Sequence, residues 1–326
     1  MKLLFIVGIS AGLMGFMKSQ NVNIPDANFK AYLVGNSAIN INGDSEIQIS
    51  EAEDFTGTID CSSKDIVNLV GIEAFPNIKT LRCYNNKLTS LNVSKNTALT
   101  ILHCYNNQLT DLDVSKNVSL VTLMCFTNQL ANLDLSKNTV LRYLYCGGNQ
   151  LTDLDVSKNI MLQTLGCEFN RLMKLDVSKN PMLQTLQCNS NQLTSLNLKN
   201  GNNAAISTMY SFNNPILGCI QVDDDTNINI DWQKDSNSNY NTDCEKLSAT
   251  DIHKKELIFY PNPVKEILNF SDEVFNITIT DMSGKIVKQF SDPGKSVNVT
   301  NLAKGNYIIT ANAKSGKVII RKFIKQ

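Results

Sequence analysis

Cysteine is the residue type in this chain whose spacing most directly suggests chemistry. The chain has nine cysteines, and six recur at intervals of 21 residues: Cys83, Cys104, Cys125, Cys146, Cys167 and Cys188. Regularly spaced thiols in an exported chain could form disulfides or hold a metal ion. A constant interval, however, gives them equivalent places in a repeat with parallel side-chain directions, whereas a disulfide needs a particular mutual orientation. We therefore expect free, buried thiols that pack as small apolar side chains.

Two other cysteines, Cys219 and Cys244, break the interval and flank a segment rich in Asp, Asn and Ser. They are the best candidates for a disulfide, which would clamp the end of the repeated region. A pair of free thiols is the open alternative.

Oxygen-bearing side chains between residues 40 and 51 resemble the calcium loop of an EF-hand. Asn40, Asn42, Asp44 and Glu51 stand at the first, third, fifth and twelfth positions of such a loop. Two features depart from the motif, because Asn40 replaces an Asp and Ser45 replaces the invariant Gly. Calcium bound in an N-terminal cap is one hypothesis, and a turn rich in Asn and Gly is the other.

Catalytic constellations are not indicated elsewhere. The only two histidines, His103 and His253, are far apart in the chain, and we find no metal motif, nucleophile elbow or phosphate-binding loop. Glu168 is the only carboxylate predicted on the concave face, so it has no partner there for acid–base catalysis. The regularly spaced aspartates belong to turns. We expect a protein that is not an enzyme and that has no cofactor, apart from the calcium considered above.

Composition and the N-terminus indicate an exported protein. The chain has 326 residues, 42% of them hydrophobic, with 30 Lys+Arg against 30 Asp+Glu, so its balanced charge argues against a nucleic-acid partner. Residues 1–19 have a basic residue, Lys2, near their start and continue as an apolar run without acidic residues. This is typical of a signal peptide cut after Ser19, and the run is shorter than the roughly 20 residues a membrane-spanning helix needs. We expect no transmembrane segment after cleavage, a single membrane anchor being the alternative.

The regular cysteines belong to a 21-residue unit, L-x-x-L-x-C-x-x-N-x-L-x-x-L-D-V-S-K-N-x-x, with six copies in register. This unit resembles a short bacterial leucine-rich repeat, and the resemblance covers residues 56–222. It implies a mainly β fold, a solenoid with an N-terminal cap at 20–55 and a C-terminal cap and linker at 223–255. Because 21 residues leave little room for an α-helix, we expect turns or 3₁₀ segments on the return.

Alternation within each unit predicts which side chains face inward. In the short strand L-x-C, the Leu and the Cys point into the core. The Asn three residues later is expected to turn inward and bond backbone groups of its own and the next turn.

The outward positions of the first four repeats, on the expected concave face, collect aromatic, Arg, His and Met side chains, several of them enriched at interface cores. These candidate ligand-binding residues are Arg82, Tyr84, His103, Tyr105, Met124, Phe126, Tyr143 and Tyr145. We expect them to bind an extracellular protein ligand or, through the rings, a glycan. The alternative is that neighbouring rings only stabilise the sheet and that the protein is a structural surface spacer without a specific ligand.

The tail is a separate module. Short alternating apolar and polar runs between residues 256 and 326 predict a small β-sandwich of about seven strands. Its ordered motifs Y-P-N-P-V, I-T-D-M-S-G-K-I-V and L-A-K-G-N-Y-I-I resemble the C-terminal sorting domain of the type IX (Por) secretion system. The resemblance implies that residues 256–326 engage the type IX secretion machinery. The protein is then expected to be secreted or attached to the outer-membrane surface.

Overall fold

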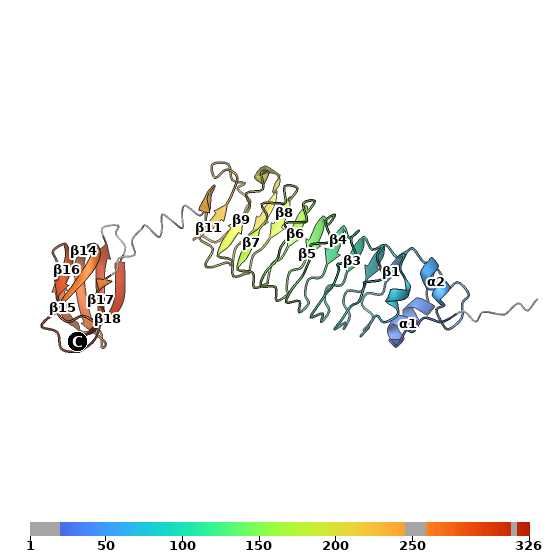
Figure 1. Ribbon diagram of the computed structural model, residues 1–326, viewed down its shortest axis with the longest axis horizontal. Helices are drawn as coiled ribbons and strands as arrows, with labels where there is room; N and C mark the ends of the chain where they lie inside the picture. Colours follow the sequence, from blue (N-terminus) through green and yellow to red (C-terminus); the bar gives the residue numbers. More distant parts are fainter. Residues whose placement is uncertain (1–19, 245–258, 314–317) are drawn as a thin grey trace, which may run out of the picture. The chain divides into compact units, whose positions relative to one another are not determined.

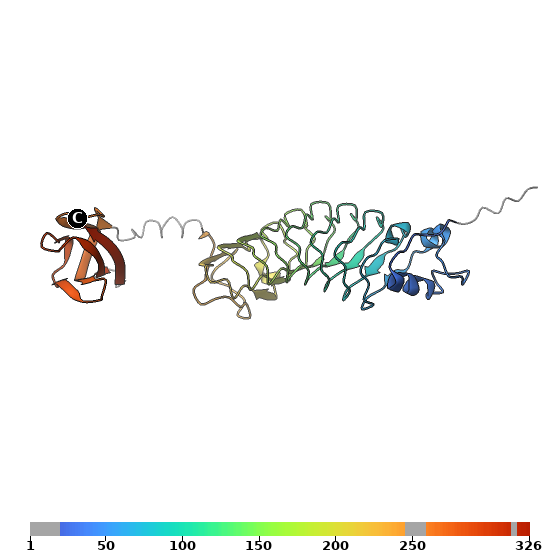
Figure 2. The ribbon, with the colours of Figure 1, turned by 90° about the horizontal axis from the view of Figure 1, so that it is seen from below.

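The computed structural model describes residues 20–244, 259–313 and 318–326, so the expected signal peptide lies outside the described residues. The chain divides into two compact units, Met1–Asp243 and Cys244–Gln326. In the first unit, two short helices lie at the N-terminal end, and successive turns of the chain stack side by side after them (Figures 1 and 2). The second unit is an antiparallel sheet. Both units are therefore built mainly from β structure.

The two helices, α1 (Ala27–Val34) and α2 (Ile49–Asp54), form the N-terminal cap. Helix α1 begins after Asp26 because that carboxylate accepts hydrogen bonds from the backbone N–H groups of Asn28 and Phe29. Phe29 and Leu33, which lie one helical turn apart, are fully buried against the core of the repeats. The cap thus closes the apolar end of the stack, as a terminal repeat requires.

The Leu-x-Cys segments form one parallel sheet in which each repeat contributes a strand. Neighbouring strands pair in register, so that Leu81 lies beside Leu102 and Leu102 beside Leu123. The eight strands, in sheet order, are β1 (Thr58–Asp60), β2 (Thr80–Arg82), β3 (Ile101–His103), β4 (Thr122–Met124), β5 (Tyr143–Tyr145), β6 (Thr164–Gly166), β8 (Thr185–Gln187) and β10 (Thr208–Tyr210).

The predicted inward alternation matches the observed burial. Leu81 and Cys83 are fully buried, whereas Arg82 and Tyr84 between and after them are partly exposed. Backbone pairing continues past each assigned strand, since the N–H of Cys83 donates to the carbonyl of His103 at 2.9 Å. Each Leu and Cys therefore enters a continuous core that no single repeat could bury alone.

A second, smaller parallel sheet appears on the later repeats. Its strands are β7 (Lys174–Asp176), β9 (Ser195–Asn197), β11 (Cys219–Gln221) and β12 (Asn239–Asn241). The segment around Cys219 therefore joins this second sheet rather than the row of Leu-x-Cys strands. Because β12 pairs with β11, the stack also continues beyond the boundary expected at residue 222. Between the cap and residue 243 the repeats contain no α-helix, and 3₁₀ turns occur at η1 (Ile72–Ala74) and η2 (Asn203–Ala205).

Buried asparagines join the turns of the array in two ladders. In the first, the Asn107 amide donates to the carbonyls of Cys104 and Cys83 and accepts from the N–H of Leu88. The bonds run to the preceding turn, so the expectation of bonds to the next turn is wrong in direction. The second ladder was not anticipated: Asn138, for example, donates to the carbonyls of Val114 and Asn117. The other members of the second ladder are Asn96, Asn117, Asn159 and Asn180.

The second unit is a curled antiparallel sheet. Its strands are β13 (Phe259–Tyr260), β14 (Ile267–Asp281), β15 (Ile286–Phe290), β16 (Gly294–Asn298), β17 (Gly305–Ala313) and β18 (Val318–Lys325). The long strand β14 pairs with β13, β15, β16 and β17, and its register shifts along the way. The described residues thus form six strands of one connected sheet rather than about seven strands in two sheets, because β14 serves both halves.

Candidate functional site

The exposed side of the first sheet carries a stack of aromatic rings, each one residue after a cysteine. Tyr84 and Tyr105 lie 4.5 Å apart between ring centroids with planes 6° apart. Tyr105 and Phe126 lie 4.2 Å apart with planes 10° apart. The parallel register of the strands holds these rings at nearly the strand spacing of about 4.8 Å. We call Tyr84, Tyr105 and Phe126 the aromatic stack.

Charged and polar groups flank the stack at its N-terminal end. Arg82 forms an ion pair with Asp60 of the preceding strand at 3.5 Å. The His103 ring lies 6.4 Å from the Tyr105 ring. Burial and the neighbouring charge of Arg82 lower the pKa of His103, which favours the neutral imidazole.

The remaining predicted residues lie on the same face but at different distances from the stack. Met124 and Tyr145 are paired neighbours on β4 and β5, and both are partly buried. Tyr143 begins β5, and its hydroxyl bonds to the Gln163 side chain at 2.9 Å. At about 3.3 Å of rise per residue, Tyr143 lies roughly 13 Å from the row that holds the stack. The structure thus brings seven of the eight predicted residues to one area and leaves Tyr143 at its far edge.

Beyond Phe126 the ring row is interrupted. The next two positions of the row are Gly147 and Glu168, linked by the bond from the Gly148 N–H to the Glu168 carbonyl at 2.9 Å. The Glu168 carboxylate folds back over Gly147, so a Cβ at position 147 would lie 2.6 Å from Oε1. Burial raises the pKa of the Glu168 carboxyl, and its Oε2 atom is buried without a hydrogen-bond partner.

The four residues of the predicted calcium loop come together in the cap, but their oxygens accept protein hydrogen bonds. Glu51 accepts from the N–H groups of Ile41, Asn42 and Gln48. The Asn40 side-chain oxygen accepts from the Gly43 N–H. Asp44 accepts from the Asn42 and Gln48 amides and from the Glu46 N–H. These donors form a hydrogen-bonded turn around the oxygens that a calcium ion would use, and calcium binding by the loop stays a prediction.

The regular thiols are enclosed in the core. Cys83, Cys104, Cys125, Cys146, Cys167 and Cys188 are free and buried, and Cys61 joins them one turn earlier. Burial raises the pKa of Cys61 and of Cys125 to about 12. Cys219 and Cys244, the pair selected from the sequence, are both disulfide-bonded.

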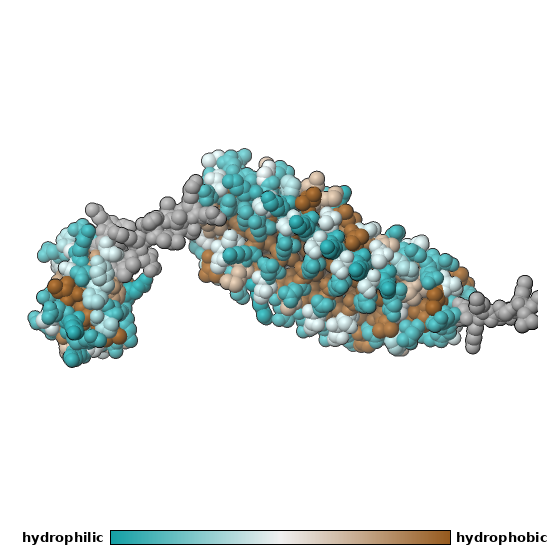
Figure 3. Space-filling model, viewed as in Figure 1, coloured by the Kyte–Doolittle hydropathy of each residue, from teal (hydrophilic) through white to brown (hydrophobic). Residues whose placement is uncertain are grey.

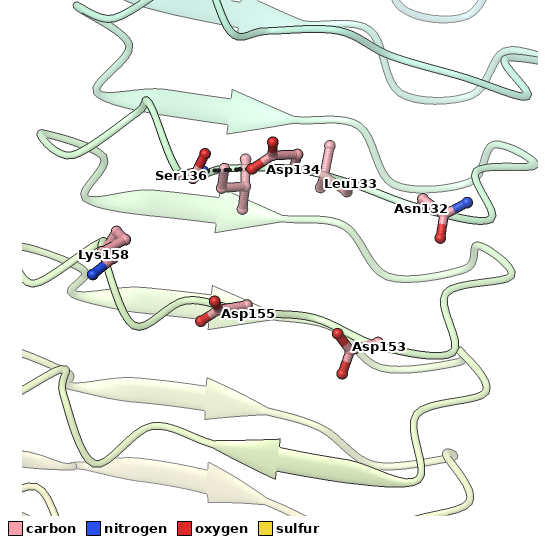
Figure 4. Close-up of a pocket in the computed structure, with 8 residues that line it drawn as sticks. Asn132, Leu133, Asp134, Ser136, Asp153, Asp155 and Lys158 are labelled. Atoms are coloured by element: carbon pink, nitrogen blue, oxygen red, sulfur yellow. Dashed lines mark hydrogen bonds between the residues drawn. The ribbon is translucent and has the colours of Figure 1, made fainter.

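A shallow acidic groove lies elsewhere on the array, between two return turns (Figure 4). It has a volume of about 240 Å³, and its lining includes Asp134, Asp153, Asp155 and Lys158. Asp134 and Asp155 each accept a hydrogen bond from the N–H of a serine two residues later. These bonds lower the pKa of both carboxyls. Within the described ranges, no three His, Cys, Asp or Glu side chains are grouped to hold a metal ion. The aspartates of the groove stabilise the return turns through these hydrogen bonds.

Apolar residues are visible along the body of the array among hydrophilic ones (Figure 3). Some lie on the return turns, where Val118, Ile160 and Met182 are each at least half exposed. Sequence reasoning selected the aromatic stack but missed the Glu168 arrangement. The two glycines at equivalent outward positions, Gly147 and Gly166, were the available signal.

Comparison with known proteins identifies both modules. Residues 258–326 match the family described as secretion system C-terminal sorting domain. Internalin C2 from Listeria monocytogenes is similar in structure, with a TM-score of 0.51 and 18% identity over 60% of this chain and 89% of that one. The functional domain of InlJ from Listeria monocytogenes aligns over 94% of this chain and 98% of that one, with 19% identity and a TM-score of 0.38. A search among curated proteins finds no match.

These findings establish the architecture and destination of the chain. The internalin C2 likeness, at this identity, concerns the fold alone. No helix in the described part of the chain is long and apolar enough to cross a membrane. The chain is a solenoid with a fold like that of leucine-rich repeat proteins, followed by a C-terminal sorting domain at residues 258–326, which indicates type IX secretion to the cell surface or the extracellular space.

Proposed function

We propose that the protein is a binding module that recognises a partner protein through the aromatic stack on the exposed side of its first sheet. The observation that carries this proposal is the stacking of three partly exposed rings, Tyr84, Tyr105 and Phe126, on adjacent strands. Aromatic side chains on a solvent-facing surface are typical of the energetic centre of a protein interface. A secreted protein that displays them has a surface suited to an extracellular partner.

The backbone hydrogen bonds of the sheet are the same with and without these rings. The bond from the Cys104 N–H to the Met124 carbonyl and the bond from the Cys146 N–H to the Gly166 carbonyl are both 2.8 Å long. The first lies beside the aromatic stack, and the second lies where the row holds only Gly147. Since the ladder is the same with and without rings, sheet stability gives an incomplete reason for placing three rings in a row.

Rigidity also favours recognition. The rings of the aromatic stack restrain one another, so binding would order few additional rotatable bonds. The fixed strands beneath them keep the rings in one geometry. A partner therefore meets a largely preformed surface.

The test compares the full chain with a variant carrying Tyr84→Ser, Tyr105→Ser and Phe126→Ser. A matched control carries Val118→Ser, Val140→Ser and Ile160→Ser, which remove exposed apolar side chains from the return turns. Retention would be measured on immobilised host matrix proteins, cell-surface proteins and glycans, after circular dichroism shows that both variants are folded. The proposal expects the native chain and the control to be retained on a protein, and the stack variant to be lost.

Other outcomes would replace the proposal. Retention on glycans alone would assign the rings to sugar recognition. Equal absence of retention for all three proteins would favour a structural surface spacer without a ligand.

A further inference from the structure

The ring row contains a gap of one side chain between an aromatic ring and a carboxylate. Phe126 is covered on one side by Tyr105. Its other neighbour in the row is Gly147, since the Thr127 N–H bonds to the Gly147 carbonyl at 2.9 Å. Gly147 has no side chain to cover the second face of the Phe126 ring. The row of stacked rings therefore ends at Phe126.

The Glu168 carboxylate lies at the floor of this gap. A Cβ built at Gly147 would lie 2.6 Å from its Oε1 atom, and one built at Gly166 would lie 3.2 Å from its Oε2 atom. Neither glycine has a positive φ, so the backbone does not require glycine at either position. The two glycines instead leave the room that the carboxylate occupies.

One oxygen of this carboxylate lacks a partner. Arg82 and Asp60 pair with each other, whereas the buried Oε2 atom of Glu168 accepts no hydrogen bond and Glu168 forms no ion pair within the described residues. A buried carboxylate oxygen without a donor is costly. It would gain most from a cationic donor brought by another molecule.

The residue after Glu168 gives an independent indication. Phe169 has a positive φ of 53° and an exposure of 62%. The residues at the equivalent positions of the neighbouring repeats are Thr127, Gly148 and Ser190. The equivalent residues Asn106, Thr127, Gly148 and Ser190 also have a positive φ, so the repeat imposes this conformation, in which a bulky aromatic residue is disfavoured. An exposed ring therefore adjoins the carboxylate at a cost to the local backbone.

We propose that the gap at Gly147 receives an arginine side chain of the partner protein, whose guanidinium pairs with Glu168 and lies against the Phe126 ring. The inference rests on the proposed function and specifies its chemistry. Arginine suits the gap better than lysine because its guanidinium is flat, carries several donors in one plane and stacks on aromatic faces. The same cation would offset the burial that raises the pKa of the Glu168 carboxyl.

The experiment uses the full chain labelled with ¹³C at glutamate carboxyl carbons and two small probes. Nα-acetylarginine methylamide carries the guanidinium, and Nα-acetylcitrulline methylamide has the same shape without the charge. We expect the Glu168 carboxyl resonance to shift and saturate with the arginine probe only. Equal or unsaturated shifts with both probes would overturn the inference.

Variants locate the effect. Glu168→Gln keeps the side-chain shape and should weaken retention on the protein partner about tenfold or more. Gly147→Ala, whose Cβ would displace the carboxylate, should also weaken it. Glu53→Gln removes an exposed carboxylate from the cap and should leave retention unchanged. If Glu168→Gln binds like the native chain while the stack variant is lost, the inference fails and the proposed function stands.

Discussion

The ring of Tyr105 lies 4.2 Å from the ring of Phe126, with planes only 10° apart, although 21 residues separate them in the chain. The repeat places both rings at the same position of adjacent turns. The Asn106 N–H, which follows Tyr105, bonds to the Phe126 carbonyl at 3.1 Å and holds the turns together. The stack is thus a direct consequence of strand register.

This relationship predicts an energetic coupling between the two rings. In a double-mutant cycle with Tyr105→Leu and Phe126→Leu, we expect a coupling of about 0.5–1.5 kcal/mol in the free energy of unfolding, because stacked rings contribute beyond their buried area. Urea unfolding of the four proteins measures it. The matched cycle of Tyr105→Leu with Tyr143→Leu should be additive within about 0.5 kcal/mol. Equal coupling in both cycles would show that the stacked geometry adds nothing.

Asp26 connects the cap to the first repeat and predicts a pH dependence of stability. Its Oδ2 accepts from the N–H groups of Val67 and Asn68, while Oδ1 caps α1. Burial alone would raise the pKa of Asp26, but bonds from four backbone N–H groups outweigh it and lower the pKa. A lowered pKa in the folded state means that the carboxylate stabilises the fold above its unfolded pKa of about 3.9. That contribution is lost as the pH falls through the folded value.

Asp26→Asn should therefore destabilise the protein most at neutral pH. Asparagine has one acceptor oxygen, so either the helix cap or the bonds from Val67 and Asn68 are lost. This loss should lower the free energy of unfolding by about 1–3 kcal/mol. Thermal unfolding at pH 7 and at pH 3 measures the difference from the native chain, which should shrink at the lower pH. Asp54→Asn, at an exposed cap position, is the control. A constant difference at both pH values would contradict the assigned role.

Much of the fold could be predicted because the repeat makes each position visible several times. Leu81 and Cys83 recur at constant spacing, and a period of two assigns them inward. The second sheet could not be predicted in this way. The Leu-Asp-Val pattern at 154–156 is the same as that at 175–177, yet only the later copy overlaps a paired strand, β7. Local sequence does not distinguish the two, because pairing depends on how closely neighbouring turns approach.

The candidate site likewise has one part that the sequence predicts and one part that it does not. The aromatic stack follows from outward positions at a fixed interval. The placement of Glu168 depends instead on space left by Gly147 and Gly166 on other turns, and the contact of Asp26 with Val67 spans 41 residues. Such contacts arise from packing between turns, which a pattern within one turn does not contain.

The second asparagine ladder predicts a large effect from a single amide. Asn138 is fully buried and donates to the carbonyls of Val114 and Asn117 at 3.1 and 2.9 Å. Asn138→Ala leaves both carbonyls without this donor, at about 1–3 kcal/mol for each group left unsatisfied. Urea unfolding should show the loss, whereas Lys137→Ala at the adjacent exposed position should change stability by less than about 0.5 kcal/mol. Similar values for both variants would mean that the ladder contributes little.

The core thiols are predicted to be unreactive in the folded protein. Because burial raises the pKa of Cys61 and of Cys125 to about 12, the reactive thiolate is nearly absent at pH 8. A thiol-specific colorimetric reagent should detect no thiol in the native chain and seven after unfolding in guanidinium, since seven of the nine cysteines are free. Reduction before unfolding should raise the count to nine by releasing Cys219 and Cys244. Rapid labelling of the native chain would show that the thiol ladder is open to solvent.

The cap loop gives the last prediction, which concerns calcium. Glu51 already accepts three backbone N–H bonds, so binding an ion there would require breaking them. We expect the same melting temperature in millimolar calcium and in excess chelator, because only a ligand that favours the folded state shifts the transition. Glu51→Gln should lower the melting temperature equally in both conditions, since it replaces one acceptor oxygen with a donor. A higher melting temperature in calcium, lost in Glu51→Gln, would instead establish the loop as a calcium site.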